Sequence, residues 1–164
     1  TPIKSSAASD VYKRQKQKSL TNKGFSLVEL IIVIAIMAVL IGVLAPQYIK
    51  YLDKSKISAD TQLADSVRNA ITNTLLDPSV TDNVPAENTP KTTIPGPGAT
   101  ATDFWKNVYD VLGETSYNDL LANLKYDNDN TKVVISYAVD GQKNVTVTID
   151  GGKYTTNSNE ITVD

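Results

Sequence analysis

The chain has 164 residues, of which 21% are charged, and its formal net charge at pH 7 is -2. That length suits one modest domain. The chain contains no Cys and no His, which excludes Ser-His-Asp and Cys-His nucleophiles, zinc sites built from the usual ligands, and disulfides. We therefore expect no catalytic residues, no metal site, no cofactor and no enzymatic activity.

Charge is unevenly distributed along the chain. Residues 1–24 hold six basic residues and one acidic residue, a net charge of +5. From Phe25 onward, ten basic and 17 acidic residues give a net charge of -7. Because an acidic surface repels phosphate backbones, no direct nucleic-acid binding is expected.

The segment from Phe25 to Leu44 has the composition of a membrane span. Only Ser26, Glu29 and Gly42 among its 20 residues are not apolar side chains. At a rise of 1.5 Å per residue this segment forms a helix about 30 Å long, which is the hydrocarbon thickness of a bilayer. Basic residues before the span outnumber those after it, so the positive-inside rule predicts a single-pass membrane protein with a cytoplasmic N-terminus.

Beyond the span the helix is expected to continue in amphipathic form. Tyr48 and Tyr51 stand where an aromatic belt meets the lipid headgroups. Apolar residues three, four or seven apart then form one face, and the helix should end near Asp77, before Pro78. The residues of this face are Ile49, Leu52, Ala59, Leu63, Val67, Ala70, Ile71 and Leu75.

Polar residues are expected on the other face of this helix. Lys56 and Asp60 are four residues apart, and Asp65 and Arg68 are three apart. Each such pair adds only about 0.2–0.5 kcal/mol to helix stability. Asp60 is thus predicted to face solvent.

The region from Pro78 to Thr102 holds five of the seven prolines and is expected to be an irregular surface loop. Asp103 is a candidate N-cap for a short helix that stops at Gly113, and Ser116 is a candidate N-cap for a second one. The apolar residues of the two helices are Phe104, Trp105, Val108, Tyr109 and Leu112, then Leu120, Leu121 and Leu124. An exposed adhesive patch is the alternative for the aromatic residues, but aromatic side chains at helical spacing usually fill a core.

The last third of the chain changes to the period of two that is typical of strands. The expected strands are residues 133–139, 145–149, Lys153–Thr156 and Ile161–Val163. Asp140-Gly141 and Gly151-Gly152 mark turns, the first of them within a hairpin. The predicted fold is therefore α+β, with the second half of the long N-terminal helix packed on a small antiparallel sheet within residues 132–164.

The segment Asp127–Thr131 begins like a calcium-binding loop. Such a loop needs Gly at its sixth position and Glu at its twelfth, where this chain has Lys132 and Ala138. A polar turn over residues 127–130 is therefore expected.

The junction from Lys23 to Glu29 places a basic residue and Gly24 directly before the apolar span. A carboxylate inside a spanning helix costs about 2.5–3.5 kcal/mol on insertion scales, so Glu29 is a functional candidate that needs a neutralising partner. The alternatives are a plain membrane anchor and a secretory signal peptide cleaved after Ala45. Pro46 directly after that site would hinder cleavage.

At this junction the chain resembles the type IV pilins, whose precursors carry a basic leader that ends in Gly, followed by Phe-Ser/Thr-Leu-Val-Glu and an apolar helix. The matching residues are Gly24-Phe25-Ser26-Leu27-Val28-Glu29, and the likeness extends to about Leu63. The resemblance implies that a prepilin peptidase cuts between Gly24 and Phe25 and methylates the new amine of Phe25. Glu29 then becomes the fifth residue, and a neighbouring subunit's amine is its expected partner.

The resemblance also implies an organisation and a function. Residues 1–24 would be the leader peptide, residues 25–52 the membrane and filament-core helix, and residues 53–164 the globular head. Subunits stored in the membrane would be polymerised by an assembly ATPase and a platform protein into a homo-oligomeric surface pilus, which could serve adhesion, twitching motility or DNA uptake. Many relatives close a C-terminal loop with a disulfide, so this cysteine-free chain is expected to rely on strand pairing there.

Two other functions compete with a pilus subunit. A pseudopilin of a type II secretion or competence system would share the junction and the helix. A membrane-anchored enzyme has no visible chemistry here, because only scattered carboxylates are available for acid-base work.

Gly42 and Pro46 mark an expected weak point of the long helix. Pro46 has no N–H, so the carbonyl of Gly42 loses its helical partner, and Gly42 itself weakens the helix by about 0.5–1 kcal/mol. We expect a kink here in the monomer and local unwinding in a filament.

Overall fold

The computed structural model describes residues 24–129 and 131–164. The expected leader, apart from Gly24, and the basic residues that orient the span lie outside the described residues. The chain divides into two compact units with the boundary between Leu44 and Ala45.

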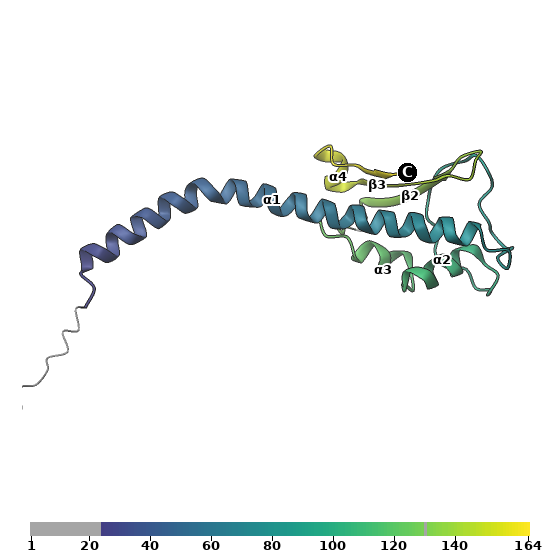
Figure 1. The fold of residues 1–164 in the computed structure, drawn as a ribbon, viewed down its shortest axis with the longest axis horizontal. Coiled ribbons are helices and arrows are strands. Elements are labelled where there is room, and N and C mark those ends of the chain that lie inside the picture. Colours follow the sequence, from purple (N-terminus) through teal and green to yellow (C-terminus); the bar gives the residue numbers. More distant parts are fainter. Residues whose placement is uncertain (1–23, 130) are drawn as a thin grey trace, which may run out of the picture. The chain divides into compact units, whose positions relative to one another are not determined.

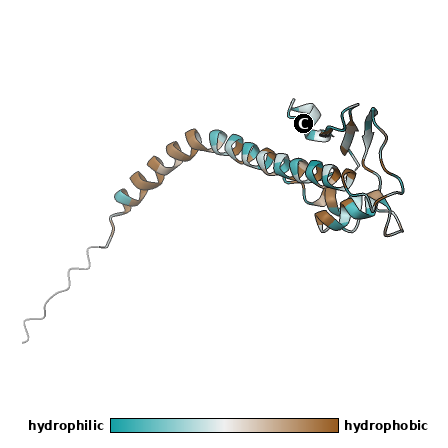
Figure 2. Ribbon diagram, turned by 45° about the vertical axis from the view of Figure 1, so that its right-hand side comes forward, coloured by the Kyte–Doolittle hydropathy of each residue, from teal (hydrophilic) through white to brown (hydrophobic). Residues whose placement is uncertain are grey.

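The longest element is α1, a helix of 49 residues from Leu27 to Leu75. Its first part is apolar after Glu29. Figure 2 shows a teal first turn followed by the brown of hydrophobic residues, whereas the later part alternates between brown and teal. Within the described residues, α1 is the one helix long and apolar enough to cross a membrane. Pro46 lies inside α1, and the helix ends at Leu75, close to the predicted end at Asp77.

The second unit contains a four-stranded antiparallel sheet with the strand order β1-β2-β3-β4. The strands are β1 (Thr89–Thr93), β2 (Val133–Val139), β3 (Val145–Gly151) and β4 (Ile161–Val163). Ile135 of β2 stands opposite Ile149 of β3, which stands opposite Ile161 of β4. In the turn between β2 and β3, the Asp140 carboxylate accepts hydrogen bonds from the backbone N–H groups of Gln142 and Asn144. The hairpin prediction is confirmed.

Three short helices complete the second unit, namely α2 (Phe104–Leu112), α3 (Tyr117–Ala122) and α4 (Gly152–Thr156). Asp103 caps α2 by accepting a hydrogen bond from the backbone N–H of Lys106 at 3.0 Å, and Gly113 ends it with φ 74°. Ser116 caps α3 by accepting from the N–H of Asp119. These predicted boundaries are confirmed, because each depends on a local capping residue that the sequence displays.

The core lies around the second half of α1, which runs between the sheet and the α2–α3 pair (Figure 1). Phe104, Trp105 and Tyr109 are all at least 95% buried, which confirms that they belong to the core. Phe104 and Trp105 meet edge to face at a centroid separation of 5.2 Å, a geometry that aromatic pairs favour.

The predicted apolar face of α1 is only partly correct. Val67, Ala70 and Ile71 are buried as expected, but Ile49, Leu52 and Ala59 are exposed. The reason is that the head packs against α1 only from about residue 57 onward. The apolar spacing begins earlier in the helix, where none of the described residues covers it.

The region expected to be an irregular loop contains an additional strand, β1. It pairs with β2 at the edge of the sheet, and its register shifts between Thr89 and Thr92, around Pro90. An edge strand tolerates a proline at such an irregularity because one side of it needs no ladder hydrogen bonds. The high proline content of this region predicted a loop, although the β-branched threonines of β1 favour a strand.

The strand expected at Lys153–Thr156 is wrong, because these residues form α4. Gly151 and Gly152 have φ values of 86° and 49°, which let the chain turn away from β3. A Cβ on Gly151 would lie 2.0 Å from the carbonyl oxygen of Lys132. Ile161–Val163 is a strand as predicted.

Candidate functional site

The residues of the predicted processing junction are open to solvent. Gly24, Phe25 and Ser26 precede the first helical residue, Leu27. A Cβ on Gly24 would meet nothing within 4 Å, and Phe25 is 92% exposed. The peptide bond between Gly24 and Phe25 is thus accessible in this structure, whereas Lys23 lies outside the described residues.

Glu29 and Ser26 form a reciprocal cap at the start of α1. The backbone N–H of Ser26 donates to Glu29 Oε2 at 2.9 Å, and Ser26 Oγ accepts from the N–H of Val28 at 3.3 Å. Two of the N–H groups that a helix start leaves unpaired are thereby satisfied. The Ser-x-x-Glu spacing of residues 26–29 is the sequence signal of such a capping box.

The cap leaves the Glu29 carboxylate with free hydrogen-bond acceptor positions. A carboxylate has two oxygens and about four acceptor positions, and Ser26 occupies one of them. Glu29 is the only ionisable residue between Phe25 and Leu44. Its neighbours Phe25, Leu30 and Val33 line with it a surface hollow of about 350 Å³, so the carboxylate belongs to the lining of an otherwise apolar depression.

The first part of α1 presents its apolar side chains to the outside. Every Val, Leu, Ile, Met and Phe from Phe25 to Leu44 is at least 50% exposed. Contiguous apolar surface of this extent marks a membrane or protein contact. Gly42 and Pro46 lie inside this helix, and a Cβ on Gly42 would meet nothing within 4 Å.

Asp60, predicted to face solvent, is buried in the head with 1% exposure. Its Oδ1 accepts from the backbone N–H of Lys125 at 2.7 Å, and its Oδ2 accepts from the N–H of Tyr126 and from Tyr154 Oη, both at 2.8 Å. The expected exposed pairing with Lys56 is therefore wrong. The pairing of Asp65 with Arg68 is confirmed, with 3.9 Å between Oδ1 and Nε.

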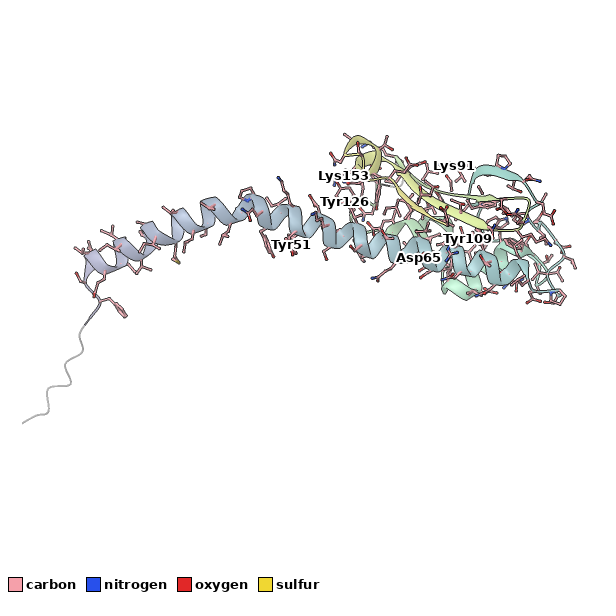
Figure 3. The ribbon with its side chains drawn as sticks, turned by 45° about the horizontal axis from the view of Figure 1, so that its top comes forward. Tyr51, Asp65, Lys91, Tyr109, Tyr126 and Lys153 are labelled. Carbon is pink, nitrogen blue, oxygen red and sulfur yellow. The ribbon has the colours of Figure 1, made fainter. Side chains whose placement is uncertain are left out.

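The Asp60 network connects segments that are far apart in the sequence. It joins α1 to the turn after α3 and to α4. Tyr126 lies between α1 and α4 (Figure 3). Tyr126 Oη accepts from the side-chain amides of Asn157 and Asn159. Burial and the hydrogen bond to Asp60 raise the pKa of Tyr154 far above its usual range. The C-terminal region is thus held by this carboxylate as well as by strand pairing.

The described residues of the segment that resembles a calcium loop make local polar contacts, and Asn130 of the predicted turn lies outside the described residues. Asp129 pairs with Lys132 at 2.7 Å, and the hydrogen bonds from Lys132 and Thr131 lower the pKa of Asp129 to about 2. Asp127 accepts from the backbone N–H of Lys153 at 2.8 Å. Within residues 24–129 and 131–164, no three Asp and Glu side chains gather as metal ligands would.

Comparison with known proteins finds matches that cover part of the chain. The model of the prokaryotic N-terminal methylation motif matches residues 20–45. Two type IV major fimbrial proteins FimA from Dichelobacter nodosus are each 43% identical over 60 residues, which is 37% of this chain. The matched region spans 38% and 37% of the length of these two relatives. No solved structure matches the chain.

The motif match includes the junction and the exposed apolar helix, the two features that the geometry singles out. The fold of the described residues, a long apolar helix continuing into a small antiparallel sheet domain, agrees with the same group of proteins. These findings confirm the resemblance to type IV pilins over the part of the chain that carries the N-terminal methylation motif.

Proposed function

We propose that this protein is a structural subunit of a type IV pilus. The observation that carries the proposal is the first part of α1, in which every large apolar side chain is at least half exposed and one carboxylate, Glu29, lies at the start. A bilayer keeps these apolar side chains out of water before assembly, and neighbouring helices do so in a filament. This function requires no catalysis by the chain itself.

Processing is the first step of the proposed function. A prepilin peptidase cleaves between Gly24 and Phe25 and methylates the amine of Phe25. Gly24 has no side chain, so an extended backbone at this position can approach a peptidase cleft closely.

Assembly follows from the chemistry of Glu29. In the membrane the carboxylate lies near the cytoplasmic surface, where water and headgroups reduce its cost. Among packed helices it needs a cation, because an unpaired buried charge is strongly destabilising. The amine of Phe25 from a neighbouring subunit supplies that charge, and pairing at one axial height sets the register between helices. An assembly ATPase and a platform protein drive the step from the membrane into the surface filament.

Bending of α1 in the filament is assigned to Gly42 and Pro46. The missing N–H of Pro46 frees the Gly42 carbonyl, so packing can unwind the helix there at low cost. A straight, fully hydrogen-bonded helix through this stretch in both monomer and filament would contradict this part of the proposal.

The mature N-terminus is the direct test of processing. We expect mass spectrometry of the chain from membranes and from sheared filaments to show a methylated Phe25 as the first residue. Gly24→Val should block cleavage, whereas Gly42→Ala, at another glycine with open space around it, should be cleaved normally. A mature chain that starts at Pro46 would identify a secretory signal peptide instead.

Filament length separates the two assembly systems that use this kind of subunit. Electron microscopy of cells with and without the gene should show long surface filaments that depend on it. Short or absent fibres, combined with normal processing, would favour a pseudopilin.

A further inference from the structure

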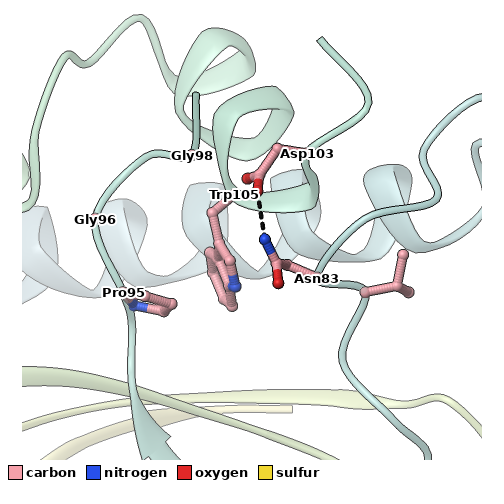
Figure 4. A pocket seen from close by; sticks show the side chains of 7 residues that line it. Asn83, Pro95, Gly96, Gly98, Asp103 and Trp105 are labelled. Carbon is pink, nitrogen blue, oxygen red and sulfur yellow. Dashed lines mark hydrogen bonds between the residues drawn. The ribbon is translucent and has the colours of Figure 1, made fainter. Parts of the chain in front are cut away.

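A cavity in the head lies where the loop after α1 meets the start of α2. Its volume is about 430 Å³, within the range of about 300–1,000 Å³ that is usual for small-molecule sites. The residues that line it are Asn83, Val84, Pro95, Gly96, Gly98, Asp103 and Trp105 (Figure 4). All of them belong to the second unit, and none takes part in the proposed assembly mechanism.

Trp105 contributes an unpaired hydrogen-bond donor to this cavity. The residue is only 5% exposed, yet its indole N–H has no hydrogen-bond partner in residues 24–129 or 131–164 and is not sealed from solvent. Figure 4 shows the indole nitrogen on the edge of the ring that faces Asn83. Because this N–H reaches solvent and has no partner among the described residues, it is free to donate to water or to a molecule in the cavity.

Asn83 contributes an acceptor next to that donor. Its side-chain Nδ2 donates to Asp103 Oδ2 at 2.6 Å, which fixes the amide and leaves Oδ1 without a partner among the described residues. Asp103 also accepts from the backbone N–H of Lys106. The carboxyl fits closely against Gly98, where a Cβ would lie 1.9 Å from Asp103 Cγ.

The charge in the cavity selects the kind of ligand. Burial alone would raise the pKa of Asp103, but the hydrogen bonds from Asn83 and from backbone N–H groups lower it on balance, so the carboxylate is ionised at neutral pH. No Lys or Arg lines the cavity. Anions are therefore repelled, and the site lacks the cations that phosphates and carboxylates require.

A neutral hydroxyl group fits the remaining polar atoms. It can accept from the Trp105 indole N–H and donate to Asn83 Oδ1 at the same time. Pro95 and Val84 provide apolar surface beside these two groups, as needed for the C–H faces of a polyhydroxylated ring. We propose that this cavity binds a neutral carbohydrate, held between Trp105, Asn83 and Asp103.

The proposal goes beyond the filament function; the measurement on sheared filaments rests on that function, and the measurement on the solubilised chain does not. The chain has one Trp, so tryptophan fluorescence comes from a residue that lines this cavity, and the variants below show whether a change in it arises there. Sheared filaments and the detergent-solubilised full chain are titrated with glucose, galactose, mannose and N-acetylglucosamine. We expect a saturable change in Trp105 emission with at least one of these sugars, in both preparations.

Two variants with matched controls test where the sugar binds. Gly96→Leu should fill the cavity without strain, because a Cβ on Gly96 meets nothing within 4 Å; Ala99→Leu, at a neighbouring exposed position, is its control. Asn83→Gly removes the acceptor at a residue with φ 55°, and Asn88→Gly, at φ 62°, is its control. Loss of these contacts should weaken binding about tenfold or more, while the controls bind as the unchanged chain does.

Three results would overturn the proposal. One is the absence of any saturable signal with all four sugars. Another is equal binding by Gly96→Leu and its control, which would place the sugar elsewhere. The third is binding by the solubilised chain but not by filaments, which would mean that a neighbouring copy fills the cavity after assembly. None of these results would affect the evidence on cleavage or filament formation.

Discussion

The two parts of α1 differ in the exposure of their apolar side chains. Between Leu27 and Leu44 each large apolar side chain is at least half exposed, whereas Val67, Ala70 and Ile71 in the later part are almost fully buried by the head. Both parts are regular helix. The later part completes its packing within one chain, and we infer that the first part is covered by a membrane or by other molecules.

The two carboxylates on α1 show the same difference. Asp60 is buried and receives three hydrogen bonds from its own chain. Glu29 is exposed and receives one, from the backbone N–H of Ser26. We infer that Asp60 acts on the stability of the head and that Glu29 acts on assembly, and each can be changed separately.

The largest effect is expected from Glu29→Leu. The apolar residue removes the cost of inserting a charge, so the variant should reach the membrane and be cleaved, but it should assemble few or no filaments because the pairing with a neighbour's amine is lost. Glu29→Asp should be partly impaired by its shorter reach. The measurement is sheared-filament yield relative to the subunit level in membranes. Normal filament yield from Glu29→Leu would disprove the pairing, and loss of the membrane pool would assign the defect to insertion or folding.

Asp60→Asn should give the next largest effect, on the head alone. The amide replaces one acceptor oxygen by a donor, so at least one of the buried donors loses its partner, at a cost of about 1–3 kcal/mol for each unpaired group. Asp65→Asn is the matched control, since its carboxylate is about half exposed and pairs with Arg68 at 3.9 Å; this change should cost less than about 1 kcal/mol. Denaturant unfolding of the detergent-solubilised chain compares them. Equal stability of the two variants would show that Asp60 does not hold the C-terminal region in place.

Local signals in the sequence were sufficient for much of the fold. Asp103, Gly113 and Ser116 set helix boundaries through their own side chains or backbone, and the Asp140-Gly141 turn fixes the hairpin. The burial of Asp60 was not predictable in this way. Its donors come from residues 65 to 94 positions later in the chain, and periodicity on α1 alone indicates an exposed polar residue.

The other differences also have physical causes. β1 depends on pairing with a distant strand, and its Pro90 suggests a loop when considered alone. α4 forms because Gly151 and Gly152 adopt positive φ, which directs Tyr154 into the core toward Asp60. At the junction, Gly24, Phe25 and Glu29 were recognisable from sequence, but the bond between Ser26 and Glu29 was found only in the structure.

A smaller effect is expected at alkaline pH. Burial and Asp60 raise the pKa of Tyr154, so the folded state disfavours the tyrosinate. The contribution of Tyr154 to the free energy of unfolding is fully present below the pKa of a tyrosine in the unfolded chain, about 10, and is lost as the pH rises above that value. Tyr154→Phe should therefore reduce the stability at neutral pH and flatten its alkaline decline, whereas Tyr51→Phe, at a residue that is 78% exposed, should change neither. Unfolding curves from pH 7 to 11 measure this, and an unchanged alkaline slope in Tyr154→Phe would contradict it.

The smallest effect is expected from Ser26→Ala. Loss of the Ser26 hydroxyl removes the cap on the Val28 N–H and should destabilise the helix start by about 0.5–2 kcal/mol. Filament yield should fall moderately, and Ser26→Thr should restore it because the hydroxyl is retained. If Ser26→Ala assembles normally while Glu29→Leu does not, the cap has no part in presenting Glu29 to a neighbour.

The most direct test of the central claim, that the exposed first part of α1 is completed by other copies of the chain, is a structure of the sheared filaments by electron cryo-microscopy. The account predicts chains that start at Phe25, with the apolar residues up to Leu44 buried among neighbouring helices. It also predicts that the Glu29 carboxylate lies within hydrogen-bonding distance of a neighbouring Phe25 amine. Filaments in which these helices remain exposed, or in which Glu29 faces solvent without a cation, would contradict the account.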